Sequence, residues 1–561
     1  MADLKPTDLG LPPKFTEFRS DQFDTAATIA ASDKRFVVLA SPTGSGKSII
    51  SMTVARLLGG RTLYLTATKG LQQQLTADFA PIGLKDVRGA NNYRCVALDK
   101  GGELYGYDKA GTTCDEAPCR AGVACTMKPS NDNPFAKGCN YYDAVKAAEK
   151  ADFVVTNYAF LMAANRYMEP GVIGKFDNLI LDEAHDAPDL LSDFVAVTLK
   201  ESDCDELLDS GLPPIGDGPD AWVEWASMHR PKVEAEIDSL VRAEGKWSPA
   251  KIKRARRLHD MAGRLSILSA AYAWHRAEGA DPHVTIVGVT PDWVAERAED
   301  GGSVTFSPVW AYRYAEEFLW SGIKRILLVS ATILPRTAHY LGIADADFDY
   351  VEQRSTFSIE RRPIVSVACE RSSFRMTHDQ WSNVVEAVDQ ILDLWPNEKG
   401  IIHTVSYDRM KRLVDASSYR DRLVHHFSRN AREKIEHFQR AIGPYVLASP
   451  AAATGYDFPY DQCRFQIIIK VPFVDSRPAV IKARSKSDKK YLDYLAAQAL
   501  VQMCGRGMRA ADDSCVTYIL DDNIRWFMQS AEKFLPRWFR AAYKRSPTLP
   551  PRSALHGGIA R

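Results

Sequence analysis

Ser41-Pro-Thr-Gly-Ser-Gly-Lys-Ser48 directly follows the apolar, β-rich run Phe36–Ala40 and precedes an amphipathic stretch that continues to Leu58. A strand, a glycine-rich loop and a helix in this order form the context that a phosphate-binding loop requires. Backbone N–H groups from Thr43 to Lys47 would surround a β-phosphate, and the helix dipole would favour its negative charge. The segment therefore predicts a nucleotide site in an α/β protein with a parallel sheet.

The residues of this loop have separate predicted roles. Lys47 would bridge the β- and γ-phosphates, and the hydroxyl of Ser48 would bind Mg²⁺. Gly44 and Gly46 allow the backbone to approach the phosphates closely, whereas Ser41 replaces the first glycine of the strict pattern. The predicted ligands are ATP and Mg²⁺. The residues assigned to the nucleotide are Thr43, Gly44, Ser45, Gly46, Lys47 and Ser48.

The length of 561 residues predicts three to four domains, at about 150 residues per domain. Apolar residues make up 45% and charged residues 25%, which excludes disordered, collagen-like and fibrous proteins. Lys plus Arg (71) equals Asp plus Glu (71), which disfavours a binder that works through overall positive charge. No run approaches the about 20 apolar residues that cross a bilayer. We therefore expect no membrane association and a cytoplasmic location, in a bacterium or a viral host, near the nucleoid.

A pair of carboxylates ends the next strong apolar run, Asn178–Asp182, within the sequence Leu181-Asp-Glu-Ala-His185. Asp182 would hold the Mg²⁺ shell, and Glu183 would orient and deprotonate the attacking water. His185 is assigned to the same catalytic motif. The alternative, an exposed acid pair at a strand end, is less favoured because a phosphate-binding loop lies upstream.

A third motif, Gln502-Met-Cys-Gly-Arg-Gly-Met-Arg509, lies far downstream in a second run of α/β pattern. If this segment is helical, Gln502, Arg506 and Arg509 share one face. Guanidinium groups from a neighbouring domain would stabilise charge that develops on the γ-phosphate. A surface helix with two arginines is the alternative reading.

Five of the ten cysteines fall between positions 95 and 139. In a reducing compartment such a cluster is more typical of metal binding than of disulfides. A four-iron, four-sulfur (4Fe-4S) cluster needs four thiolates. Zinc held by four cysteines makes the same demand, and the spacing alone does not separate the two. The five candidates are Cys95, Cys114, Cys119, Cys125 and Cys139.

The order of these motifs resembles that of superfamily 2 DNA helicases of the XPD/DinG type, which carry an iron–sulfur cluster. Phe18–Gln22 is similar to the adenine-reading Q motif of the family, and the resemblance extends from there to Arg509. Through it, the nucleotide site also includes Arg19, Gln22, Gly455 and Asp457. Thr454 departs from the family, which usually has Glu at this position of motif V. Other segments similar to family motifs are Tyr64–Lys69, Asp152–Tyr158, Ser330–Thr332, Ile401–Ser406 and Ser449–Pro459.

The resemblance implies an α/β fold with two RecA-like P-loop motor domains. It also implies that an iron–sulfur domain and a mostly helical Arch domain are inserted into the first motor domain. The expected boundaries are residues 1–84, 140–186 and 308–350 for motor domain 1, 85–139 for the iron–sulfur domain, 187–307 for the Arch and 351–561 for motor domain 2.

The position of the cysteines between the family's motifs Ia and II favours a 4Fe-4S cluster over zinc. The surroundings of Cys95 and Cys139 resemble the first and last ligands of the family. The middle pair must come from Cys114, Cys119 and Cys125. We favour Cys119 and Cys125, with Cys114 as the alternative.

The implied function is an ATP-dependent DNA helicase that acts as a monomer on single-stranded and forked DNA, moves 5′ to 3′ and unwinds duplex. The alternative is an ATP-driven translocase or remodeller that does not separate strands. The run Lys482–Lys490, with Tyr491 and Tyr494, is expected to hold the strand through basic and aromatic groups. The basic stretch Lys251–Arg257 fits a solvated helix face and a nucleic-acid surface equally well. The sequence does not identify loading partners.

Overall fold

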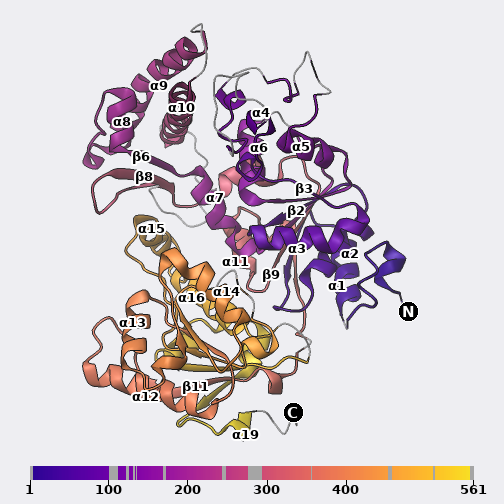
Figure 1. The fold of residues 1–561 in the computed structure, drawn as a ribbon, viewed down its shortest axis with the longest axis vertical. Coiled ribbons are helices and arrows are strands. Elements are labelled where there is room, and N and C mark those ends of the chain that lie inside the picture. Colours follow the sequence, from indigo (N-terminus) through magenta and orange to yellow (C-terminus); the bar gives the residue numbers. More distant parts are fainter. Residues whose placement is uncertain are drawn as a thin grey trace.

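The computed structural model describes residues 4–555, apart from internal gaps. The gaps are residues 20, 100–111, 122–124, 130–132, 134–135, 169–171, 243–247, 276–292, 356, 453–455, 457 and 509–511. Four residues discussed above, Thr454, Gly455, Asp457 and Arg509, therefore lie outside the described part of the chain. Two α/β domains and two insertions are seen in Figure 1. Among the described residues, no helix combines the length and the apolar character that crossing a membrane requires.

The first domain contains a parallel sheet in the order β10-β1-β9-β5-β2-β4-β3. The run Phe36–Ala40 is fully buried as β1 because helices cover both faces of the sheet. Its strands are β1 (Phe36–Ala40), β2 (Thr62–Thr66), β3 (Lys85–Asp86), β4 (Phe153–Asn157), β5 (Asn178–Asp182), β9 (Arg325–Ser330) and β10 (Phe348–Glu352). Its helices are α1 (Gln22–Ala31), α2 (Lys47–Leu58), α3 (Lys69–Phe79), α5 (Asn140–Lys150), α6 (Tyr158–Tyr167), α7 (Ala187–Val195) and α11 (Pro335–Tyr340).

The second domain contains another parallel sheet, in the order β13-β14-β12-β15-β16-β11-β17. Its strands are β11 (Ile364–Glu370), β12 (Gly400–His403), β13 (Leu423–Val424), β14 (Val446–Ser449), β15 (Phe465–Ile468), β16 (Val516–Asp521) and β17 (Tyr543–Ser546). Its helices are α12 (His378–Leu394), α13 (Tyr407–Ala416), α14 (Ala431–Arg440), α15 (Ala479–Ser487), α16 (Tyr491–Cys504), α17 (Ile524–Ser530), α18 (Arg537–Ala542) and α19 (Arg552–Leu555). Two α/β domains with parallel sheets confirm the predicted fold class.

Two segments interrupt the first domain. The cysteine-containing segment has little regular structure, with α4 (Val96–Asp99) and a short 3₁₀ turn at Pro118–Ala121. The second insertion combines helices with an antiparallel sheet in the order β6-β8-β7, so it is less purely helical than expected. Its elements are β6 (Val197–Lys200), α8 (Glu201–Leu208), α9 (Gly218–Arg242), α10 (Pro249–His275), β7 (Trp293–Arg297) and β8 (Ser303–Pro308).

The basic stretch of α10 is largely paired with acids within the chain. Arg257 Nη2 lies 2.8 Å from Asp203 Oδ1 on α8, and Arg254 Nε lies 2.6 Å from Glu236 Oε1 on α9. Arg256 Nη2 reaches Asp115 Oδ2 in the cysteine segment at 3.7 Å. These ion pairs favour the solvated, intramolecular reading of this helix over a nucleic-acid surface.

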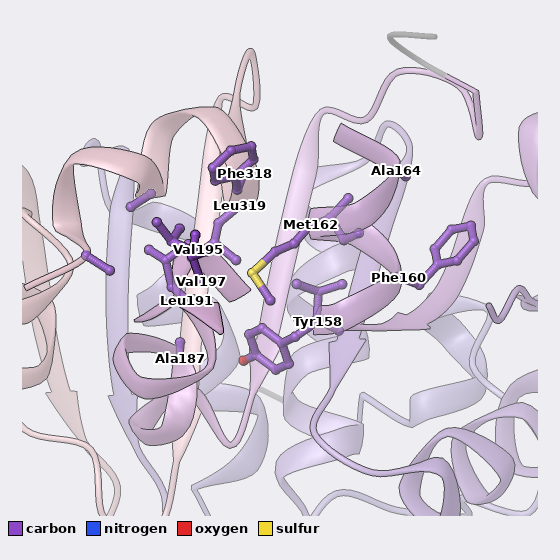
Figure 2. Close-up of a cluster of buried hydrophobic side chains, with 14 of the residues drawn as sticks. Tyr158, Phe160, Met162, Ala164, Ala187, Leu191, Val195, Val197, Phe318 and Leu319 are labelled. Atoms are coloured by element: carbon purple, nitrogen blue, oxygen red, sulfur yellow. The ribbon is translucent and has the colours of Figure 1, made fainter. Parts of the chain in front are cut away.

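An apolar cluster fixes α7, which joins the first sheet to the second insertion. Figure 2 shows Leu191 and Val195 of α7 close to Tyr158 and Met162 of α6. All four side chains are at most 2% exposed. The Tyr158 hydroxyl also donates to the main-chain oxygen of Asp182 at 2.9 Å, so α6 is attached to the end of β5. The position of α7 is therefore set by the core of the first domain.

Candidate active site

The glycine-rich loop connects β1 to α2, as its sequence predicts. Gly44 and Gly46 have φ angles of 76° and 85°, in the left-handed region that favours glycine. A Cβ atom on Gly46 would lie only 2.4 Å from Gln22 Nε2. Lys47 is the first residue of α2, so the helix N-terminus points toward the predicted phosphates.

Ser41 is accommodated where the strict pattern has glycine. Its hydroxyl donates to Gln353 Oε1 at 2.6 Å and lies 2.6 Å from the hydroxyl of Ser45. The N–H of Ser41 donates to the carbonyl of Ser330 at 2.9 Å. The serine hydroxyl thus ties the loop to Gln353, directly after β10, whereas the main-chain bond to β9 does not depend on the serine side chain.

Arg19 and Gln22 hold the loop from the other side. Gln22 Nε2 donates to the carbonyl of Ser45 at 2.8 Å, and Arg19 Nη1 donates to the carbonyl of Gly44 at 3.1 Å. The N–H of Arg19 donates to Gln22 Oε1 at 2.9 Å. These two residues, predicted from the resemblance, thus contact the predicted phosphate-binding loop directly.

The two carboxylates at the end of β5 lie beside this loop. Lys47 Nζ is 3.6 Å from Glu183 Oε1. Burial and the charge of Glu183 raise the pKa of Asp182 to about 7. Burial also raises the pKa of Glu183, but Lys47 and Arg506 are among the groups that outweigh it and hold that pKa at about 2. Glu183 is therefore ionised at neutral pH and can accept a proton.

His185 joins the two domains through hydrogen bonds. Its Nδ1 lies 2.7 Å from Ser330 Oγ, which donates to Glu183 Oε2 at 3.1 Å. Its Nε2 contacts the side-chain amide nitrogen of Gln502. Asp186 Oδ1 lies 3.1 Å from Nε2 and would favour a proton there. With the amide donating to Nε2 and the serine donating to Glu183, a neutral His185 instead carries its proton on Nδ1 in this path. It runs from Gln502 to Glu183 without a gap.

Ser330 was not among the predicted site residues. It ends β9 and is fully buried, between the loop after β1 and the acids after β5. The available signal was a Ser-Ala-Thr sequence at the carboxyl end of an apolar strand, where parallel sheets place their functional side chains.

The expected helical face containing Gln502, Arg506 and Arg509 is wrong for Arg506, because α16 ends at Cys504. Gly505 follows, and a Cβ there would lie 2.6 Å from Thr43 Oγ1, so only glycine allows this close approach. Arg506 Nη1 donates to the carbonyl of Tyr456 at 2.9 Å. Burial lowers the pKa of Arg506, and the negative charge of Glu183 opposes that shift. The charges of the two side chains therefore attract each other.

Six predicted catalytic residues thus come together from both domains. They lie around the carboxyl ends of β1 and β5 and the end of α16. This arrangement offers main-chain donors, one lysine and one arginine to a bound anion, and two acids to a metal ion and a water molecule. The six residues are Lys47, Asp182, Glu183, His185, Gln502 and Arg506.

All five clustered cysteines line one pocket, together with Tyr141 and Tyr142. Thiol hydrogen bonds join Cys114 to both Cys95 and Cys139. Hydrogen bonds from Cys114 lower the pKa of Cys95 to about 7 and that of Cys139 to about 6.

The remaining two thiols form a second pair, since Cys119 bonds to Cys125. Arg120 and Lys128 also line the pocket and bring positive charge to it. Within the described ranges, no three Cys, His, Asp or Glu side chains already stand in position to hold a metal ion.

The prediction that Tyr491 and Tyr494 stack on DNA bases is wrong, because each side chain is only 2% exposed. Arg484 is also buried, at 4% exposure. Lys482 and Lys489 are exposed at the surface. Only part of this basic run therefore remains available to a nucleic acid.

Comparisons with known proteins give matches to both domains. Residues 389–542 match the family model of the helicase C-terminal domain, and residues 15–203 match that of the type III restriction enzyme, res subunit. ATP-dependent DNA helicase YoaA of Haemophilus influenzae is 26% identical over 222 residues, which are 32% of this chain and 35% of that protein. The match thus spans about a third of this relative's length.

Solved structures of XPD proteins are similar over most of the chain. A structure titled XPD_Helicase is 14% identical, covers 94% of this chain and 100% of its own, and gives a TM-score of 0.60. The structure of S. tokodaii Xpd4 is 12% identical, covers 94% and 99%, and gives a TM-score of 0.53. At such low identity the likeness concerns the fold, and it confirms two RecA-like domains.

Proposed function

Because the chain belongs to the superfamily 2 helicases of the XPD/DinG type, we propose that it is an ATP-dependent DNA helicase. It moves along one DNA strand and separates the duplex ahead of it. The hydrogen-bonded path from Gln502 through His185 and Ser330 to Glu183 is the strongest support. Because this path crosses between the domains, loss of the γ-phosphate would change the contact that joins them.

ATP binds at the glycine-rich loop. The N–H groups of Thr43–Lys47 surround the β-phosphate, and Lys47 turns from Glu183 to the β- and γ-phosphates. Arg19 and Gln22 keep the loop in place through the carbonyls of Gly44 and Ser45. By resemblance, the same two residues read the adenine.

Ser48 and Asp182 are the residues that would hold Mg²⁺. A hydroxyl and a carboxylate are oxygen ligands of the kind that magnesium prefers. The fit rests on Asp182, whose carboxylate is 4% exposed and costly to keep ionised without a nearby cation. When bound, the metal neutralises charge on the β- and γ-phosphate oxygens.

Hydrolysis uses residues from both domains. Glu183 accepts a proton from water while the water oxygen attacks the γ-phosphorus and the bond to the β–γ bridging oxygen breaks. Arg506, from the second domain, stabilises the charge that develops on the phosphoryl oxygens. ADP and phosphate then leave, and the domains separate again. Arg509, Gly455 and Asp457 remain predicted members of this site.

We also infer that the cysteine pocket holds a 4Fe-4S cluster. Five soft thiols with Arg120 and Lys128 nearby match the ligands and the charge that such a cluster requires. Cys114 contacts both Cys95 and Cys139, which favours it as a ligand over the pair Cys119 and Cys125 that the sequence analysis favoured. The fourth ligand is then Cys119 or Cys125. A bound cluster would hold a segment that has little regular structure of its own.

A forked duplex with single-stranded tails tests the proposed function. We expect strand separation that requires ATP and Mg²⁺ and a 5′ tail, because the family resemblance implies 5′-to-3′ movement. A fluorophore and quencher on the two strands would report separation, with a blunt duplex and a 3′-tailed duplex as controls. DNA-stimulated ATP hydrolysis and displacement of streptavidin from a biotinylated strand, without strand separation, would instead favour the translocase alternative.

Gln22→Ala is expected to raise the KM for ATP about tenfold and to change kcat by less than about twofold. The substitution removes the hydrogen bonds to Ser45 and Arg19 that order the loop, but it removes no group that contacts the reacting phosphate. Thr28→Ala is the matched control, since Thr28 is exposed on the same helix and bonds only to the carbonyl of Asp24. Steady-state ATPase assays measure both constants, and an unchanged KM would exclude this role of Gln22.

A further inference from the structure

The junction between α15 and α16 supplies two buried residues to the contact between the RecA-like domains. Arg484 is 4% exposed and Asp488 is 7% exposed. Both lie in the run Lys482–Lys490, which the sequence analysis expected to bind DNA. Their partners in the first domain are on α7 and α11.

Arg484 makes four hydrogen bonds, and its guanidinium lies over the rings of Trp310 and Tyr491. Its Nη1 donates to Asp189 Oδ1 at 2.5 Å and to the Tyr491 hydroxyl at 2.9 Å. Its Nη2 donates to Ser192 Oγ at 2.8 Å, and its Nε donates to a main-chain carbonyl of the segment after β8 at 2.6 Å. The guanidinium also lies 5.1 Å from the ring centre of Trp310. This fork therefore fixes the start of α16 relative to α7.

Asp488 makes a second contact of the same kind. Arg336 of α11 lies 2.9 Å from its Oδ2, and the hydroxyl of Tyr340 also donates to it. Tyr340 stacks on Trp310 with ring centres 4.5 Å apart, and Trp310 Nε1 donates to Ser487 Oγ at 3.1 Å. The two buried charges thus belong to one interdomain cluster.

One face of α16 continues from this cluster to the nucleotide site. Tyr491, Tyr494, Gln498 and Gln502 are spaced by three, four and four residues, so they share that face. The Tyr494 hydroxyl lies 2.6 Å from Thr337 Oγ1 and accepts a hydrogen bond from Gln498 Nε2 at 2.7 Å. Gln498 also donates to the carbonyl of Thr332 at 3.4 Å, and Gln502 contacts His185.

The partners of this face all lie just behind the nucleotide motifs. α7 starts at Ala187, two residues after His185, and α11 starts at Pro335, three residues after Thr332. α7 is fixed on its other side by the apolar cluster of Figure 2. Because α16 is attached to α7 and α11 at its start, these contacts determine where its C-terminal end lies.

We propose that Arg484 and Asp189 form an anchor that positions α16, so that Gln502 and Arg506 reach His185 and the γ-phosphate. Arg484 is thus a positioning residue for hydrolysis and not a DNA ligand. This inference rests on the proposed function. If the proposal is correct, the rate of DNA-stimulated ATP hydrolysis depends on a contact that lies away from the phosphates.

Asp189→Ala tests the anchor. We expect the kcat of ATP hydrolysis with single-stranded DNA to fall about tenfold, and the KM for ATP and the Kd for DNA to stay within about twofold. Asp205→Ala is the matched control, because it removes an exposed carboxylate on α8, outside the Arg484–Asp189 contact. Tyr494→Phe removes a single oxygen and should lower kcat in the same way. The kcat of the double variant should be only slightly lower than that of the slower single variant, because both changes act through one helix.

The outcomes separate the anchor from its alternatives. Unchanged kcat in Asp189→Ala and Tyr494→Phe, or fully additive losses, would overturn the anchor while leaving the helicase proposal standing. A higher Kd for DNA with an unchanged kcat in Asp189→Ala would indicate that this segment binds DNA and would contradict the anchor. A wild-type protein without DNA-stimulated hydrolysis would overturn the anchor and the proposed function together. If Asp189→Ala does not fold, Tyr494→Phe alone decides.

Discussion

Lys47→Ala is expected to lower the kcat of ATP hydrolysis at least about 1,000-fold. Lys47 is the first residue of α2, and its ammonium group lies 3.6 Å from Glu183, on the path to the predicted phosphates. Alanine removes the charge that would bridge the β- and γ-phosphates and leaves the main-chain donors of the loop. Because no part of the predicted strand-binding surface changes, we expect the Kd for single-stranded DNA to stay within about twofold.

Lys324→Ala provides the matched control for this variant. Lys324 precedes β9 at the end of the sheet opposite Ser330, and its side chain is 80% exposed. The Lys324→Ala variant should therefore hydrolyse ATP at the wild-type rate. Phosphate-release kinetics and fluorescence anisotropy with labelled DNA measure the two properties separately. Turnover near the wild-type rate in Lys47→Ala would remove the lysine from the site and with it the assignment of the loop.

The residues that sequence reasoning placed well belong to contiguous motifs. The loop from Ser41 to Ser48 carries its own strand, glycines and helix start, so local chemistry determines its shape. Asp182 and Glu183 follow the same logic, because a buried parallel strand delivers its last residues to one edge of the sheet. Tertiary contacts were not needed to find them.

Ser330 and Arg484 show what composition could not predict. Ser330 acts through a hydrogen bond to Glu183, which lies 147 positions away in the chain. Arg484 belongs to a run of basic residues, and its charge gave no sign that Asp189 and Ser192 would bury it. The functions of both residues depend on which helices pack together. A periodic pattern in one segment does not contain that information.

The end of α16 also depends on tertiary contacts. Gly505 and Gly507 are poor helix formers, which argues for an early end, whereas the shared face of Gln502, Arg506 and Arg509 depended on one continuous helix. The structure gives each glycine a steric role. A Cβ on Gly505 would meet Thr43 Oγ1 at 2.6 Å, and a Cβ on Gly507 would meet Cys515 Sγ at 2.2 Å. Arg506 thus reaches the site from a turn.

Serine substitutions in the cysteine pocket are expected to divide the five thiols into two groups. The purified wild-type protein should be brown and contain about four irons per chain. Cys95→Ser, Cys114→Ser and Cys139→Ser should lose the colour and most of the iron, because Cys114 contacts both Cys95 and Cys139. Cys119→Ser and Cys125→Ser should each keep the cluster, since the remaining thiol of that pair can supply the fourth ligand.

The iron content and the visible absorption spectrum, measured without any activity assay, distinguish three explanations. Cys369→Ser is the matched control, because Cys369 is a half-buried free thiol on β11 in the second domain. If Cys114→Ser keeps its iron while Cys119→Ser and Cys125→Ser each lose it, the ligand set favoured in the sequence analysis is correct. Stoichiometric zinc without iron would replace the cluster with a structural zinc site, which four thiolates hold equally well. The arginine and the lysine beside the thiols suit either metal centre, so the metal analysis decides between them.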